Sequence, residues 1–542
     1  MIQQIPADLM SRRRQSSVST SRHANAKPTK ASQAKCVQVS KPVRLDTLLT
    51  ELMFEILEHM DLADALRFRL VSRYCADVVL LAPSILRRLL RHVKAPLPYS
   101  PKPIQTLSGR EVLSLCRRAF GLEANWKRKL DKVKANGFLS LHRPYHVTLA
   151  PGGRYLITAY RSRSGEEHFI SLFDLENKSG PVMLASCPTH SSVESITVTW
   201  MENKGRQGIA VNWVRQLPLE KQATQSRGTE TVVVFIPLET IESLGDPNYV
   251  QTDSPWEVLC SRQWKASHVC VSMANNVLAV GISPNTLSFY NLEDGRKSSS
   301  KLAPLPHSAM PDPMIFAVKL MCDGKILIVR GEAGHSSQLN LHALEAYEVP
   351  GWGTSQVNAV PNNCNYIHSN QNNYTISQMY RRQKTCDNPS TEEIIEASGY
   401  LPTITISVES SPPHKGITQY RLFPTRDPTS TDASPKFGYS WPITVWTGHY
   451  AEHDKHRTTT LSLSGADRSL GFPFTTPGRV STPVLGEFMV LDSYGEDSIP
   501  SVALPIHVEN EVIQCVAWDE SSGKIVLATA NDLKIWVLDF AV

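Results

Sequence analysis

The sequence lacks several short motifs that mark common classes of enzyme and metal-binding protein. It has no Gly-x-Ser-x-Gly elbow, no His-Glu-x-x-His pair, no P-loop and no Gly-x-Gly-x-x-Gly turn. Its ten cysteines are scattered over 542 residues without a Cys-x-x-Cys pair, which argues against a zinc site and against a dense disulfide framework. We therefore expect no catalytic residue, no cofactor and no metal ion, and we expect reduced thiols in a cytoplasmic or nuclear protein. Histidines 449, 453 and 456 lie near Asp454, but a solvated polar loop is a better interpretation of that stretch than a metal site.

Long apolar runs are also absent, since none approaches the roughly 18 residues that a membrane-spanning helix needs.

Acidic residues are scarce in two segments: residues 1–44 hold nine Lys or Arg against one Asp, and residues 84–136 hold thirteen basic against three acidic groups. Residues 45–83 carry a net charge of −4, and the remaining C-terminal part carries −9. Because the positive charge is local, we expect neither a nucleic-acid-binding body nor a membrane partner, and only the basic segments suit contact with an anion.

Residues 1–43 are rich in Ser, Arg, Lys and Gln and have few large apolar groups. Such a segment cannot offset the entropy of ordering, so we predict a disordered basic tail. The run Arg12–Arg14 is also compatible with part of a nuclear localisation signal, and an Arg- and Ser-rich start is compatible with a mitochondrial presequence. We prefer the solvated tail because no convincing amphipathic helix is present.

The stretch 44–83 has the periodicity of short helices and more apolar surface than it can bury alone. Glutamates at positions 51, 55 and 58 alternate with apolar residues, a spacing that places the apolar side chains on one helical face. Asp61 is placed to cap a second helix, and a third helix is expected to end before Pro83. Three short helices with surplus apolar surface are typical of one half of an interface.

This stretch resembles the F-box family, whose members read roughly Leu-Pro-x-Glu-Leu-Leu-x-x-Ile-Leu, then an aspartate, then Leu-x-x-Val-Cys-x-x-Trp. The residues that stand in that register are Leu48, Glu51, Leu52, Met53, Ile56, Leu57, Asp61, Asp64, Leu66, Leu70, Val71 and Asp77. The chain departs from the family where Leu49 and Leu62 replace prolines and where Cys75 replaces tryptophan. The alternative is an ordinary three-helix subdomain that caps the rest of the chain.

The resemblance implies docking on the small adaptor subunit of a cullin–RING (SCF) ubiquitin ligase, and through that subunit on cullin. The residues whose apolar faces are expected to form the buried centre of the interface are Leu52, Ile56, Leu57, Leu66, Leu70 and Val71. The departures from the family lead us to expect an affinity below that of a consensus F-box. Restoring proline at position 49 and tryptophan at position 75 is expected to raise it.

Residues 84–139 are expected to form a helical linker region. Ser84–Val93 has a helical apolar face, and Ser108 with Glu111 has the spacing of a capping box that opens a further helix. Gly121 is expected to interrupt that helix, and Gly137 to stop its Lys-rich continuation. The basic face suits phosphate or an acidic partner, but we prefer a solvated linker helix that packs against the next domain.

From residue 140 to residue 542 the sequence changes to short alternating runs separated by Gly, Pro, Asn and Ser, which predicts an all-β domain. Seven strand-like runs recur about 47 to 78 residues apart: Ile170–Glu176, Val232–Glu239, Leu287–Glu293, Leu339–Glu345, Tyr420–Phe423, Phe488–Asp492 and Ile535–Asp539. Such a repeat indicates a propeller of seven blades, with six or eight as alternatives. The stretches that break the rhythm and are expected to be surface loops lie near 204–228, 299–312, 350–398, 425–440 and 451–483.

The first and last units resemble WD-type repeats. His146–Ala159 reads as a strand, a Pro-Gly-Gly turn and a second strand. Val512–Phe540 matches more fully, with Asp532 at the place of the family's structural aspartate and Trp536 at the place of its strand-ending tryptophan. This resemblance implies a propeller whose loops hold the contacts with a partner.

The two resemblances together imply a multidomain α plus all-β protein, with an F-box-like helical module followed by a WD-like β-propeller. Such a protein would be the substrate-recognition subunit of an SCF-type ubiquitin ligase, with an unknown target protein on the propeller. It would contribute proximity and orientation rather than ubiquitin chemistry. One rival is a propeller scaffold without a ligase role. Another is a propeller enzyme that uses the central channel, for which the sequence offers no set of acids, bases or metal ligands.

Overall fold

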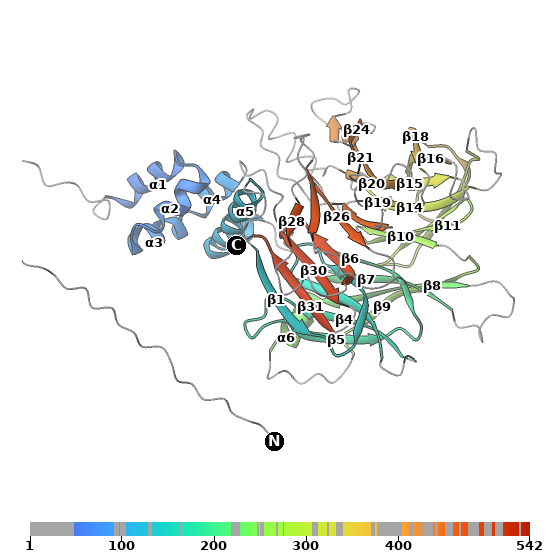
Figure 1. Cartoon of the computed structure of the whole chain (residues 1–542), viewed down its shortest axis with the longest axis horizontal. Coiled ribbons are helices and arrows are strands. Elements are labelled where there is room, and N and C mark those ends of the chain that lie inside the picture. The colour runs from blue at the N-terminus through green and yellow to red at the C-terminus, as the bar shows by residue number, and fades with distance from the viewer. Residues whose placement is uncertain are drawn as a thin grey trace, which may run out of the picture. The chain divides into compact units, whose positions relative to one another are not determined.

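The computed structural model consists of N-terminal helices followed by sheets of mostly antiparallel strands (Figure 1). The residues that the structure describes are 48–90, 97, 104–127, 133–162, 165, 167–217, 228–246, 249, 254–266, 269–274, 276–305, 313–321, 325–331, 340–361, 363–369, 374–376, 404–410, 416–422, 424–426, 437–439, 443–449, 459–464, 468–474, 487–492, 501–503, 513–529 and 533–541. The helices are α1 (Thr50–Glu58), α2 (Leu62–Phe68), α3 (Arg73–Leu81), α4 (Pro83–Leu90), α5 (Gly109–Lys127) and α6 (Leu238–Leu244), with a 3-10 turn at Ile104–Thr106. Within these ranges, no helix combines the length and the apolar character that a membrane crossing requires.

Side-chain caps lie at the starts of three N-terminal helices, α2, α3 and α5, and the cap of α3 is Ser72. Asp61 accepts a hydrogen bond from the amide of Asp64 at 2.7 Å, at the start of α2. At the start of α5, the amide of Ser108 donates to Glu111 Oε2 at 2.7 Å and the amide of Glu111 donates to Ser108 Oγ at 3.4 Å. These bonds satisfy amides that the first helical turn leaves unpaired, so the predicted cap at Asp61 and the predicted capping box are both confirmed.

The described strands form seven sheets of four or five strands and one two-stranded ribbon. The first three sheets are β2 (Arg143–Leu149), β3 (Tyr155–Arg161), β4 (His168–Asp174), β5 (Val182–Pro188); β6 (Val193–Asn203), β7 (Arg206–Gln216), β8 (Thr229–Pro237), β9 (Glu257–Trp264); and β10 (Val269–Ala274), β11 (Val277–Ile282), β12 (Thr286–Asn291), β13 (Lys297–Leu302), β17 (Ser355–Ala359). Strand β17 pairs with β13 in parallel, whereas the other neighbours in these three sheets are antiparallel.

The next three sheets and the ribbon follow along the chain. They are β14 (Met314–Leu320), β15 (Lys325–Gly331), β16 (Asn340–Glu348), β18 (Asn363–Ser369); β19 (Tyr374–Ile376), β20 (Ile404–Ser410), β21 (Gly416–Leu422), β24 (Ile443–His449); β25 (Thr459–Ser464), β26 (Arg468–Phe474), β27 (Glu487–Asp492), β28 (Ser501–Ala503); and the ribbon β22 (Pro424–Arg426), β23 (Phe437–Tyr439). The last sheet, which we call the closing sheet, contains β29 (Ile513–Asp519), β30 (Lys524–Thr529), β31 (Lys534–Asp539) and β1 (Lys134–Leu139).

The repeat seen in the sequence coincides with one strand of every sheet. All seven runs fall on the third strand of their sheets, namely β4, β8, β12, β16, β21, β27 and β31. The first strands of neighbouring sheets contact one another from β29 to β2 and onward through β6, β10, β14, β19 and β25. This is the arrangement of a β-propeller, so the predicted fold of a helical module followed by a propeller is confirmed. The number of blades stays a prediction.

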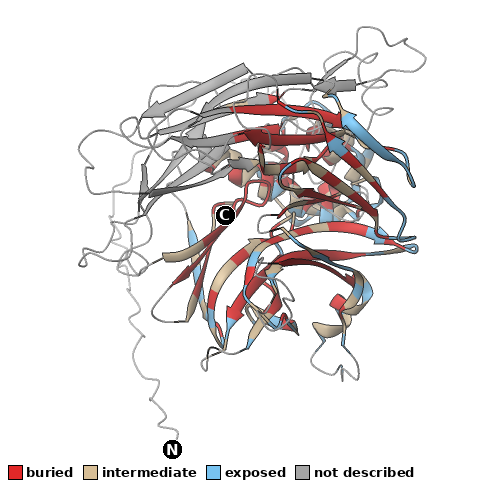
Figure 2. Cartoon of the chain, turned by 90° about the vertical axis from the view of Figure 1, so that its right-hand side faces the viewer, coloured by how far each residue is buried: buried red, intermediate tan, exposed pale blue. Residues whose placement is uncertain are grey.

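The cores of the propeller lie between neighbouring sheets, and single strands contribute to two of them. Along β8, Val234 and Ile236 pack toward the first sheet, whereas Val233 and Phe235 pack toward the third. Alternate residues of a strand point to opposite faces, so the part of β8 that lies between two apolar cores, Val232–Ile236, is apolar at every position. Figure 2 shows such buried residues running along the strands.

The closing sheet joins the two ends of the propeller. Strand β1 pairs antiparallel with β31 from Lys134 opposite Asp539 to Leu139 opposite Lys534. Gly137 lies opposite Trp536, and a Cβ atom at this glycine would come within 2.9 Å of two carbon atoms of the indole ring. The close approach of the ring therefore requires glycine here.

Strand β1 corrects the predicted boundary, which placed residues up to 139 in a helical linker. Helix α5 ends at Lys127, and residues 134–139 belong to the propeller. The local sequence has helical periodicity, but the partner strand lies about 400 residues away, and pairing with it outweighs local preference. Gly121 lies inside α5 and does not interrupt it, because one glycine costs a helix interior only about 1 kcal/mol.

Several stretches that were expected to be loops contain strands. Strand β7 lies within 204–228, β17 to β19 lie within 350–398, β23 lies within 425–440, and β25 and β26 lie within 451–483. Polar strands such as β18 (NCNYIHS) do not show apolar alternation, so their pairing cannot be read from their own sequence. Asp532, at the expected position of the WD-repeat aspartate, lies outside the described residues.

Candidate functional site

Helix α1 has two adjacent apolar stripes, of which only one is buried. Met53 and Leu57 are 0% and 2% exposed and pack inside the helical module. The other stripe has the spacing i, i+3, i+7, and its members Leu49 and Leu52 are 68% and 43% exposed while Ile56 is partly buried. Burial of apolar area stabilises a protein or complex by roughly 25 cal/mol per Å², so this exposed stripe is a candidate contact surface.

A second exposed apolar pair lies directly before α3. Leu70 is 75% exposed and Val71 is 61% exposed. The hydroxyl groups of Thr50 in α1 and Tyr74 in α3 lie 3.4 Å apart, so the first turns of the two helices are neighbours. The exposed stripe and the exposed pair therefore flank the same contact. We call the four residues the apolar cluster: Leu49, Leu52, Leu70 and Val71.

The six residues predicted from the sequence to dock a partner have different environments. Leu52, Leu70 and Val71 are exposed, whereas Ile56 and Leu66 are partly buried. Leu57 packs inward, because it lies on the buried stripe of α1. Leu49 was missed, although its spacing of three residues from Leu52 was a signal that could have placed it on the same face.

Comparison with protein families places this module. The family model of the F-box domain matches residues 45–86. The helical module is an F-box domain. No curated protein matches the chain in sequence.

Solved structures similar to the chain include propeller domains of low sequence identity. The β-propeller domain of Cps50 (Swd1) from Myceliophteria thermophila is 9% identical with a TM-score of 0.44, and the match covers 74% of this chain and 98% of that one. The C-terminal WD40 domain of Sif2 is 11% identical with a TM-score of 0.34, covering 75% and 98%. Sqt1 from Saccharomyces cerevisiae is 8% identical with a TM-score of 0.35, covering 74% and 97%.

The backbone of the F-box at Leu49 already has the conformation of proline. Its φ of −63° and ψ of 147° lie at the start of α1, and its carbonyl accepts from the amide of Met53 at 3.2 Å. We therefore expect Leu49→Pro to raise the free energy of unfolding of the F-box by about 0.4–1 kcal/mol, because proline restricts the unfolded chain. Thermal melting of the helical signal checks this, and a lower melting temperature would show that the proline strains α1.

Cys75, at the position of the family's tryptophan, has a different role from the one expected. It is 0% exposed and belongs to the core of the F-box. A tryptophan at this position would overpack that core, at a cost of typically 1–3 kcal/mol. This replaces the expectation that Cys75→Trp would strengthen docking, and it leaves Leu49 as the position where the family residue fits.

The F-box core continues into the segment that leads to the propeller. Arg87 of α4 donates to the carbonyl oxygens of Ile104 and Leu107 at 3.0 and 2.9 Å. Cys116 of α5 lies against the carbonyl of Leu86 at 3.9 Å, and burial raises the pKa of its thiol to about 12. A thiol that stays neutral in this way is a packing group and not a nucleophile.

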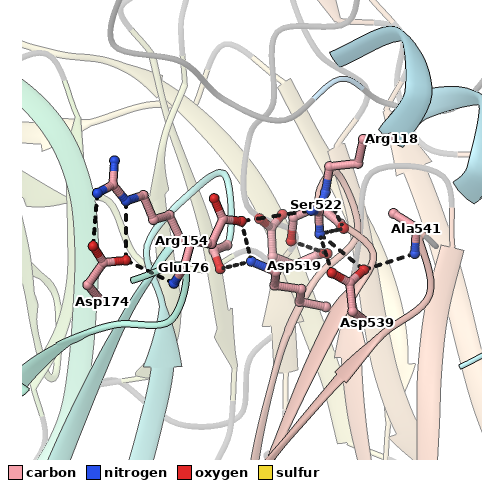
Figure 3. Close-up of polar contacts among 10 residues, drawn as sticks. Arg118, Arg154, Asp174, Glu176, Asp519, Ser522, Asp539 and Ala541 are labelled. Atoms are coloured by element: carbon pink, nitrogen blue, oxygen red, sulfur yellow. Dashed lines mark hydrogen bonds and ion pairs between the residues drawn. The ribbon is translucent and has the colours of Figure 1, made fainter. Parts of the chain in front are cut away.

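Helix α5 also binds the propeller, as Figure 3 shows for Arg118. Its guanidinium donates to the carbonyl of Ser522 at 2.8 Å and lies 3.2 Å from both carboxylate oxygens of Asp539. Asn125 Nδ2 donates to the carbonyl of Phe540 at 2.9 Å in a buried environment. Helix α5 therefore packs on the propeller, and Arg118 is paired within the chain. Residues 128–132 of the expected Lys-rich helix lie outside the described residues.

Glu176, which follows β4, lies in the middle of this contact. Its Oε1 atom is 2.5 Å from Lys524 Nζ and 3.8 Å from Arg118 Nη1. Burial opposes ionisation of this carboxyl group, but the positive charges of Lys524, Arg118 and Arg154 outweigh it, so the pKa of Glu176 lies below its ordinary value of 4.5. The stabilising effect is therefore complete above pH 4.5 and is lost as the pH falls through the folded-state pKa.

We expect Glu176→Gln to lower the free energy of unfolding by less than about 1 kcal/mol at pH 7, because the side chain is 45% exposed and partly screened. The difference from wild type should shrink as the pH is lowered from 6 to 3. Thermal melting of both proteins across that range checks the expectation. A difference that stays constant would assign the effect to packing rather than to the charge.

Among the described residues, no three His, Cys, Asp or Glu side chains gather closely enough to hold a metal ion. Burial also raises the pKa values of the Cys270 and Cys515 thiols to about 12 each. The described site presents an apolar surface to water, on a module whose neighbouring helix α5 contacts the propeller.

Proposed function

We propose that the chain is the substrate-recognition subunit of an SCF-type cullin–RING ubiquitin ligase. The F-box docks on the adaptor subunit, and through it on cullin, while the propeller holds a target protein. The observation that carries this proposal is the apolar cluster, which lies exposed on a module that matches the F-box domain. Exposing an apolar surface of this kind to water costs free energy, and a partner that covers the surface recovers that free energy.

The chain contributes position rather than chemistry. Two binding modules on one chain convert a second binding event into an intramolecular one, which raises the effective concentration of the target near the ligase. The contact between α5 and the closing sheet supports this role, because it limits the range of orientations between the two modules. No residue of the chain needs to take part in ubiquitin transfer.

The alternative is a propeller scaffold without a ligase role, in which the helices serve only to complete the chain's own fold. The contact of α5 with the closing sheet is what this alternative requires, because it gives the helices a role within the chain's own fold. The two functions differ in whether the apolar cluster binds anything.

Affinity purification with mass spectrometry separates the two. The full chain should bring down the adaptor and cullin, and a Leu52→Asp/Leu70→Asp variant should lose both. Substitution is a sharper test than removal of residues 45–80, because α4 and α5 pack against the deleted helices. A full chain that captures neither protein would leave the scaffold as the better account.

A further inference from the structure

The turn between β29 and β30 is buried, although turns between the strands of a hairpin normally face water. The four residues Asp519–Ser522 are each 0% or 1% exposed. Leu122 of α5 covers the turn from one side, and a Cβ atom at Gly523, whose φ is +65°, would come within 2.6 Å of it. Gly153 of the first sheet covers the other side, since a Cβ atom there would lie 2.0 Å from Ser522 Oγ.

Charged groups from three parts of the chain meet at the same place. Arg118 comes from α5, Glu176 follows β4 of the first sheet, and Asp539 ends β31 of the closing sheet (Figure 3). Lys524 begins β30 of the closing sheet. Arg118 contacts both sheets, because it lies 3.8 Å from Glu176 and 3.2 Å from Asp539. Lys524 adds a direct link between the sheets by donating to the carbonyl of Gly153 at 3.0 Å. The seam between the first and the closing sheet is thus bridged by a side chain of α5.

We propose that α5 holds the propeller ring closed and that Arg118 is the residue that positions this helix. We call the contacts of Arg118 and Asn125 with the closing sheet the clasp. Only residues 128–133 separate the end of α5 from strand β1, which pairs with β31 to close the ring. Holding α5 on the closing sheet keeps β1 close to its partner strand and raises its effective concentration there. Release of α5 from the closing sheet would therefore both weaken the pairing of β1 with β31 and free the F-box from its fixed orientation.

This coupling has a consequence for the ligase, which rests on the proposed function. An adaptor bound to the F-box is held at a fixed direction relative to the propeller only while the clasp is shut. The clasp itself does not depend on any partner, because all of its contacts lie within the chain.

The test compares Arg118→Ala with Arg118→Lys in the full chain. Lysine keeps the charge but lacks the planar, multi-nitrogen fork with which the guanidinium meets the carbonyl of Ser522 and both oxygens of Asp539, so it should rescue only part of the effect. Arg117→Ala is the matched control, because Arg117 is the exposed neighbour on the same helix. Hydrogen exchange of the β1 and β31 amides measures closure. The distance distribution between spin-labelled unnatural residues at the exposed positions 55 and 178 measures orientation.

We expect Arg118→Ala to speed exchange in β1 and β31 at least tenfold and to broaden the distance distribution, with exchange in β10 to β12 unchanged. The control should match wild type in every measurement. Unchanged exchange in β1 and β31, or an equal rise in β10 to β12, would overturn the proposal, since the second result would mark Arg118 as a general stabiliser. None of these measurements contains an adaptor. A failure of the clasp is therefore distinguishable from a failure of adaptor binding.

Discussion

A chain that ends at Ala530 is expected to lose the folded propeller altogether. The missing segment contains β31, which pairs with β1 on one side and with β30 on the other. Five large apolar side chains of this segment are less than 7% exposed: Ile535, Trp536, Val537, Leu538 and Phe540. Loss of each such side chain costs about 2–5 kcal/mol, and together they exceed the 5–15 kcal/mol that stabilises a typical domain.

Circular dichroism and size-exclusion chromatography check this expectation. The shortened chain should show no cooperative β-sheet melting and should aggregate, because the deletion exposes the edges of β1 and β30. A chain that ends at Phe540 keeps every paired strand and serves as the control. Equal melting of the chain ending at Ala530 and the intact chain would contradict closure of the ring by β31.

Leu70→Asp is expected to abolish adaptor binding without unfolding the F-box. A charge at a buried position would unfold the module, but Leu70 is 75% exposed, so the charge stays in water in the free protein. In a complex the carboxylate would be buried in an apolar contact. An interface anchor is worth 2 kcal/mol or more, so the dissociation constant should rise by well over tenfold.

Leu81→Asp is the matched control for this variant. Leu81 is 68% exposed on the same module, but it lies at the end of α3 remote from the Thr50–Tyr74 contact. Binding should survive this substitution, and both variants should melt like wild type. A second variant, Leu52→Ala/Ile56→Ala, should also weaken binding more than tenfold. If Leu70→Asp bound the adaptor as tightly as wild type, the apolar cluster would not be the docking surface.

Local chemistry made much of the fold predictable. The capping groups at Asp61 and at Ser108 with Glu111 signalled two helix starts, because a cap needs only residues three positions apart. The strand repeat was visible because a third strand that is covered on both faces, such as β8, contains a run of apolar residues.

Features that depend on distant partners could not be predicted. Strand β1 owes its conformation to β31, and the buried turn before Lys524 owes its burial to α5. At the candidate site, helical spacing identified the apolar residues of α1 but not which stripe faces water. Leu57 was therefore expected to dock a partner, whereas Leu49 was treated only as a departure from the family pattern.

Titration of the purified adaptor subunit into the purified full chain, followed by isothermal calorimetry, tests the proposed docking most directly. We expect saturable one-to-one binding with a dissociation constant in the micromolar range or below. The heat capacity change should be negative, because apolar area is removed from water. Binding should disappear with Leu70→Asp and persist with Leu81→Asp. No heat of binding at micromolar concentrations of the folded wild-type chain would contradict the ligase function and leave the propeller scaffold in its place.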